Sequence, residues 1–152
     1  MGLFKGSGLK DAKMFERGAY LGVGKFQLEI TKVLTKDTRK SGNGFIVEFT
    51  VVQTSDEKNH PVGSKATWFQ SLLDKDVAWG AIKEWAYAVM GFKNTKEDTD
   101  RAKKELDPVI EDLCDEAIDK GALNGKRVNV ETHMKKTGKD KDFTVHTWSP
   151  AS

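Results

Sequence analysis

The sequence predicts a single mainly β domain with an α-helical insert, and three observations carry this prediction. From Gly24 to Leu73, three runs alternate apolar and polar residues, which is the period of a strand with one buried face. Between Asp76 and Gly121 the apolar spacing changes to three and four residues, which is typical of amphipathic helices. Alternation then returns in two further runs, from Lys126 to Thr137 and from Phe143 to Trp148.

The first three strands form a meander with one expected interior face. The residues expected to share buried sides are Phe26, Leu28 and Ile30 in the first strand and Phe45, Val47, Phe49 and Val51 in the second. The third strand runs from Lys65 to Leu73, where the adjacent Trp68 and Phe69 must point to opposite faces. We expect Trp68 to be the exposed one, because it shares its side with Ala66 and Gln70.

Three helices are expected between the third and fourth strands. Their predicted bounds are an N-cap at Asp76 with a terminal glycine at Gly91, Thr95 to Leu106, and Asp107-Pro108 to Gly121. Trp79 and Trp85 should lie on the core face of the first helix. The outward carboxylates of the third helix are interpreted as a solvated face, and these are Glu111, Asp112, Asp115, Glu116 and Asp119.

This order, β-β-β-α-α-α-β-β, is the order of the five-stranded OB-fold barrel, so we expect an OB-fold-like barrel over residues 20–152, after a flexible arm at 1–19. Ligands of that fold cross strands two and three, between the loops joining strands 1–2 and 4–5. Here those loops are Lys36 to Asn43 and Lys135 to Asp142, and both are basic. The insert is acidic instead, with 8 Lys and Arg against 13 Asp and Glu over residues 74–121.

A cationic groove with aromatic rings suits single-stranded nucleic acid, because lysines follow the phosphates and rings stack on bases. The expected function is therefore binding of single-stranded DNA with little base preference, with salt-sensitive affinity and quenching of tryptophan fluorescence. The predicted binding residues are Lys36, Arg39, Lys40, Trp68, Lys135, Lys136, Lys139, Lys141 and Trp148.

Several short segments also resemble proteins from bacteriophage replication and recombination gene clusters. These segments are Ala19–Phe26, Gly44–Phe49, His60–Ser64, Gly125–Val130 and Asp142–Pro150. The resemblance implies an OB-fold single-stranded-DNA-binding protein that coats single strands during viral replication, with other replication or recombination proteins as partners. It leaves oligomer formation open.

Two other classes of function are compatible with the sequence. One is a structural or protein-interaction barrel of a phage assembly, in which the basic loops are simply solvated. The other is a nuclease that uses Asp112 or Asp115 with a divalent metal. The sequence shows no nucleophile motif, no cofactor motif and no metal-ligand spacing among His60, His133, His146 and Cys114. His133 and His146 are expected to face each other across the last hairpin as a packing pair.

The composition fits an intracellular globular protein. The 152 residues include a single cysteine, which rules out an internal disulfide framework and fits a reducing compartment. No apolar run is long enough to span a bilayer, and residues 1–13 lack the apolar centre of a signal peptide. We therefore expect a cytoplasmic protein, in the host cell if it is viral.

Overall fold

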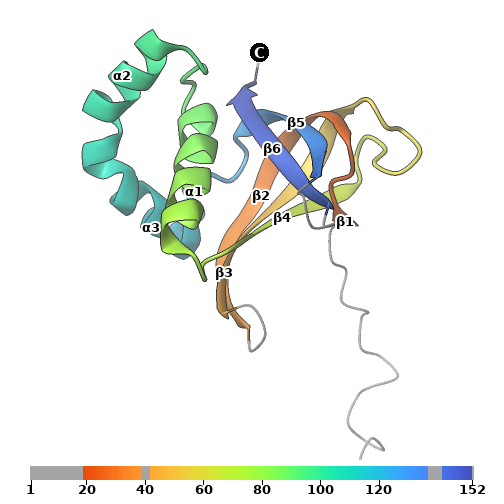
Figure 1. Cartoon of the computed structure of the whole chain (residues 1–152), viewed down its shortest axis with the longest axis horizontal. Helices are drawn as coiled ribbons and strands as arrows, with labels where there is room; N and C mark the ends of the chain where they lie inside the picture. The colour runs from red at the N-terminus through yellow and green to blue at the C-terminus, as the bar shows by residue number, and fades with distance from the viewer. Residues whose placement is uncertain (1–18, 39–41, 137–141, 152) are drawn as a thin grey trace, which may run out of the picture.

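The computed structural model describes residues 19–38, 42–136 and 142–151, and it shows a β-sheet with a helical insert (Figure 1). The strands are β1 (Ala19–Tyr20), β2 (Gly24–Thr38), β3 (Gly42–Thr54), β4 (Lys65–Ser71), β5 (Arg127–Lys136) and β6 (Asp142–Pro150). The helices are α1 (Lys75–Val89), α2 (Lys96–Glu105) and α3 (Ile110–Lys120), with a 3₁₀ turn at Asp107–Val109. The mainly β class and the position of the helices, between the third and fourth long strands, are confirmed.

One six-stranded sheet contains all the described strands, in the order β1-β4-β3-β2-β5-β6. Neighbours are antiparallel, except that β1 runs parallel to β4. The two long strands β4 and β6 share no ladder in this sheet, so it is not closed into a barrel, which differs from the expectation. Aromatic side chains stand between these two strands instead, with the ring centroids of Trp68 and Trp148 5.0 Å apart.

The hairpin ladders extend further than the sequence indicated. Pairing in the first hairpin continues to Thr38 opposite Gly42, and in the last hairpin to Lys136 opposite Asp142. The described residues of the two predicted basic loops, which are 36–38, 42–43, 135–136 and 142, therefore belong to strand ends. As predicted, Phe45 and Phe49 are buried, with Phe45 against Trp85 of α1 and Phe49 against Trp148 of β6.

Helix α1 packs on the sheet largely through the predicted face, but its N-cap and one position near its start differ. Its N-cap is Asp74, whose carboxylate accepts a hydrogen bond from the amide of Val77, so the prediction of Asp76 was wrong. Ala78 is buried in place of Trp79, which is 54% exposed. A small residue lets the helix approach the sheet closely, and a neighbour 100° further round the helix then faces outward. Trp85 does lie in the core, as expected, against Phe45.

The remaining helix ends largely follow the sequence. The Thr95 hydroxyl caps α2 by accepting from the amide of Asp98, and α2 ends at Leu106 as predicted. Gly121 ends α3 with a φ of 66°, a left-handed conformation that favours glycine. Asp107-Pro108 begins a single 3₁₀ turn instead of α3 itself, which starts at Ile110. The α3 carboxylates are exposed, as the solvated-face interpretation predicted.

Candidate nucleic-acid interface

The predicted cations that the structure describes lie near the ends of two hairpins. Lys36 is exposed on β2, opposite Gly44 of β3. Lys135 and Lys136 are the last two residues of β5, next to the end of the β5–β6 hairpin. The other four predicted cations, Arg39, Lys40, Lys139 and Lys141, lie outside the described residues.

Both tryptophans of the predicted site are buried. Trp68 is 4% exposed and Trp148 is 3% exposed, so the expectation that Trp68 faces outward was wrong. The reason is the register of the sheet, in which Trp68 pairs with Val47 on the interior face of β3. Trp68 also packs on Trp85 from α1, with ring centroids 6.0 Å apart. Neither tryptophan presents a ring on the surface where a base could stack.

Phe69 takes the outward position that was assigned to Trp68. It pairs with Ile46 on the outer face of β3, and its side chain is half-buried. The ring lies over Gly44, because a Cβ built on that glycine would be 2.2 Å from Cε2 of Phe69. Glycine therefore leaves room for the ring to lie close to the sheet beside Ile46.

The outer face of β2, β3 and β4 combines this ring with apolar and cationic neighbours. Directly paired residues share a face, and the resulting rows are Leu34–Ile46–Phe69, Lys36–Gly44–Ser71 and Lys32–Glu48–Thr67. Tyr20 of β1 lies beside Thr67 and is 67% exposed. The surface therefore presents Phe69 and Tyr20, with exposed lysines on its β2 side.

A register shift in β2 creates this arrangement. The ladder between β2 and β3 is irregular between Ile30 and Lys32, where one extra residue is inserted. Strict alternation from Phe26 would turn Lys32 inward, whereas the shift turns Val33 inward and Lys32 outward. The irregularity thus places Lys32, Leu34 and Lys36 on the same face as Phe69.

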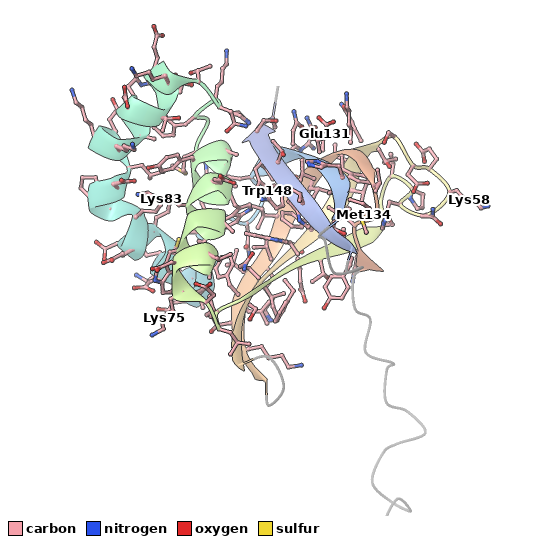
Figure 2. The ribbon with its side chains drawn as sticks, in the orientation of Figure 1. Lys58, Lys75, Lys83, Glu131, Met134 and Trp148 are labelled. Atoms are coloured by element: carbon pink, nitrogen blue, oxygen red, sulfur yellow. The ribbon has the colours of Figure 1, made fainter. Side chains whose placement is uncertain are left out.

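A cavity of about 300 Å³ continues this surface into the gap between β4 and β6. Its walls include Tyr20, Thr67 and Phe69 from one side and Thr144 and His146 from β6. Met134, which pairs with Thr144, lies near the same end of the last hairpin (Figure 2). The cavity therefore connects the aromatic face of β4 with the basic end of the β5–β6 hairpin.

His146 lines this cavity as a neutral aromatic ring. It stacks on Trp148 with the ring planes 12° apart and the centroids separated by 5.8 Å. Burial lowers the pKa of His146 below its usual value, so the ring is uncharged near pH 7. The predicted pairing with His133 was wrong, because Thr132 lies opposite His146 and His133 lies opposite Val145.

Within the described ranges, no group of three or more His, Cys, Asp or Glu side chains could hold a metal ion. None of the described helices is both long enough and apolar enough to cross a membrane.

The sequence did not identify Phe69 and Tyr20 as outward residues. Alternation shows which residues share one side of a strand, but only the pairing register between strands shows which side is buried. Phe45 and Val47 were correctly assigned to the interior, so Ile46 between them faces outward. Phe69 pairs with Ile46 and therefore faces outward as well, and this pairing was the missing information. Comparison of the chain with protein-family models and with curated proteins finds no match.

Proposed function

We propose that this protein is an OB-fold protein that binds single-stranded DNA with little base preference and without catalysis, in phage replication or recombination. The strand pairing supports the fold. β2 pairs with both β3 and β5, β4 pairs with the other side of β3, and β6 pairs with the other side of β5. A five-stranded, partly open Greek-key barrel has this kind of connectivity, with its ligand face on the second and third strands. Those strands are β3 and β4 here.

The observation that carries the proposal is the position of Phe69 between two basic hairpin ends. Its ring lies against Gly44, which pairs with Lys36 at the end of the first hairpin. The same ring lines a cavity with Thr144, two residues from the end of β6 where the last hairpin turns. In Figure 1 the starts of β3 and β6 lie toward opposite ends of β4. A single DNA strand that crosses Phe69 would therefore run from Lys36 at the first hairpin to the lysines at the end of the β5–β6 hairpin.

The chemistry of this face favours a single strand over a duplex. A ring can stack on a base only when the base is unpaired and turned outward, and stacking tolerates every base because each has a π-face. Lysines add phosphate contacts that carry no sequence information. Binding should therefore be salt-sensitive and weakly selective among bases.

The burial of three of the tryptophans determines which binding assay is suitable. Trp68, Trp85 and Trp148 are inaccessible, and the exposed Trp79 lies on α1, so the predicted tryptophan quenching is a poor assay. A labelled poly-dT strand of about 30 nucleotides would instead be titrated and followed by fluorescence anisotropy, at two salt concentrations and against duplex DNA. Tight, salt-sensitive binding of the single strand alone is the expected result.

Replacing the aromatic side chains locates the interface. Phe69→Leu and Tyr20→Leu should each weaken binding by roughly tenfold, since one base stack contributes about 1–3 kcal/mol. Trp79→Leu is the matched control, because it removes an exposed aromatic ring from a different surface.

No binding to either nucleic acid would reject the proposal and favour a protein-interaction barrel. Magnesium-dependent shortening of the labelled strand that is lost in Asp112→Asn would favour the nuclease alternative instead.

A further inference from the structure

An apolar groove of about 580 Å³ lies away from the proposed DNA face, between α1 and α3. Its apolar lining comes from both helices and from the segment after β4, and consists of Leu72, Trp79, Ile82, Ile110, Cys114 and Ile118. The floor reaches Phe45 and Thr35 on β3 and β2. A groove of this kind, between two helices with an apolar floor, suits an inserted peptide segment.

The exposure of Trp79 at this groove is unusual for a tryptophan of this chain. The other three tryptophans of the chain are buried, whereas Trp79 is 54% exposed beside Leu72 and Ile82. Tryptophan on a surface is enriched where a partner covers it, because the large ring contributes much apolar contact area.

The rim of the groove is acidic. Glu111 and Asp115 on α3 are both exposed and line the groove. The lysine at the groove, Lys83, already pairs with Asp107, with Nζ 2.8 Å from Oδ2. Figure 2 shows Lys83 between α1 and the other two helices. No ion pair joins Glu111 or Asp115 to another described residue, and such carboxylates favour an occupant that combines apolar and basic side chains.

We propose that the occupant is the N-terminal arm of the same chain, residues 1–18. Its apolar residues include Leu3, Phe4, Leu9, Met14 and Phe15. Its charges are Lys5, Lys10, Lys13 and Arg17 against Asp11 and Glu16, an excess of two positive charges. The arm therefore supplies both the large apolar side chains that the groove can bury and the cations that its rim attracts.

The arm is long enough to reach the groove within one molecule. It joins the fold at Ala19, which pairs with Ala66 near the start of β4, and the groove begins at Leu72. Six residues of strand correspond to about 20 Å, whereas eighteen extended residues span up to about 60 Å. Attachment to the same chain also raises the effective concentration of the arm at the groove to the millimolar range or above. The assignment does not depend on nucleic-acid binding.

The groove contains two natural reporters for the test. Trp79 is the exposed tryptophan, and Cys114 is the single cysteine of the chain. Acrylamide quenching of tryptophan fluorescence and the rate of Cys114 modification by an aromatic disulfide reagent would be measured on the full chain and on a Phe4→Ser, Leu9→Ser, Phe15→Ser variant. Both quantities should rise several-fold in the variant, because its arm no longer covers the groove. A Trp79→Phe background should abolish the quenching difference.

Charge reversal on α3 supplies a matched comparison. Glu111→Lys with Asp115→Lys should release the arm and raise both readouts. Asp112→Lys with Asp119→Lys makes the same change in charge on the same helix but outside the groove lining, and should leave both readouts unchanged. Circular dichroism would verify that each variant is folded.

Equal quenching and equal thiol reactivity in the full chain and the arm variant would overturn the proposal. Protection that disappears on dilution would also overturn it, because it would show that a second copy covers the groove.

Discussion

The ring of Phe69 on β4 lies directly against the backbone of Gly44 on β3. A Cβ on Gly44 would be 2.2 Å from Cε2 and 2.7 Å from Cζ of that ring, much closer than carbon atoms can approach. The place of Phe69 on the outer face therefore depends on the missing side chain at position 44. This relationship provides a way to move the ring without removing it.

Gly44→Ala should displace the ring of Phe69 and weaken binding of single-stranded DNA several-fold. The far edge of the ring can swing outward from this half-exposed site, so we expect a loss of unfolding free energy of only about 1–2 kcal/mol. Anisotropy titration and denaturant unfolding would measure the two effects separately.

Gly80→Ala is the control for this substitution. An added Cβ at Gly80 meets no atom within 4 Å, and the residue lies in α1, where alanine should stabilise the helix by about 0.5–1 kcal/mol. Its DNA affinity should equal that of the unchanged protein. Unchanged affinity in Gly44→Ala as well would separate the Phe69 ring from the interface.

Reversing the charges of Lys135, Lys136, Lys139 and Lys141 together should weaken binding by at least about tenfold at low salt, because up to four phosphate contacts are lost. The slope of log affinity against log salt should fall by about 3, since each contact to a single strand contributes about 0.7.

The control reverses four exposed lysines that lie away from both hairpins, namely Lys58, Lys93, Lys96 and Lys104. It changes the net charge of the protein equally. An equal loss of affinity in the two variants would mean that overall charge, and not the last hairpin, determines binding.

Local signals in the sequence predicted most of the elements. Alternation identified the five long strands, the Thr95 cap identified the start of α2, and Gly121 identified the end of α3. These features depend on neighbouring residues in the chain, through hydrogen bonds within one turn or the two-residue period of a strand. Local sequence is enough to specify them.

The candidate site could not be predicted in the same way, because it depends on pairing between strands. A shift of one residue in the register of β4 would exchange the faces on which Trp68 and Phe69 lie, and both residue types are equally compatible with a strand. The irregularity after Ile30, which turns Lys32 outward, is likewise set by the partner strand β3. The exposure of Trp79 follows from how closely Ala78 lets α1 approach the sheet, which is a tertiary property.

His146 should make the protein less stable as the pH falls below about 6.5. Burial lowers the pKa of His146 in the folded state below 6.5, so between these two pKa values the unfolded chain binds more protons. Stability from this residue is therefore present above pH 6.5, declines as the pH falls toward the folded pKa, and is constant below it. Unfolding midpoints in denaturant between pH 5 and 8 would measure the decline.

His146→Gln should reduce this pH dependence, whereas His133→Gln should not, because His133 is exposed on the opposite face of the hairpin. If the two variants follow the same pH profile as the unchanged protein, His146 is not the residue responsible. Tests above pH 5 avoid most of the titration of carboxylates.

The hydrogen bond between Tyr87 and Asp107 should hold the helical insert together. The Tyr87 hydroxyl donates to Oδ1 of Asp107 at 2.5 Å, and Lys83 pairs with Oδ2, so one carboxylate joins α1 to the turn before α3. Burial and the neighbouring carboxylate raise the pKa of Tyr87, which keeps the phenol protonated as a donor. Tyr87→Phe should therefore reduce the free energy of unfolding by about 1 kcal/mol.

A double-mutant cycle with Asp107→Asn tests whether this loss comes from the bond itself. Although partial burial favours the neutral acid, hydrogen bonds from Lys83 and Tyr87 hold the pKa of Asp107 below its ordinary value. The carboxylate therefore stabilises the fold above about pH 4 and loses this effect as the pH falls through its folded pKa. Positive coupling between the two substitutions at pH 7 that shrinks toward pH 3 would support the bond. Strict additivity at both pH values would show that Tyr87 stabilises the insert through ring packing on Phe92 instead.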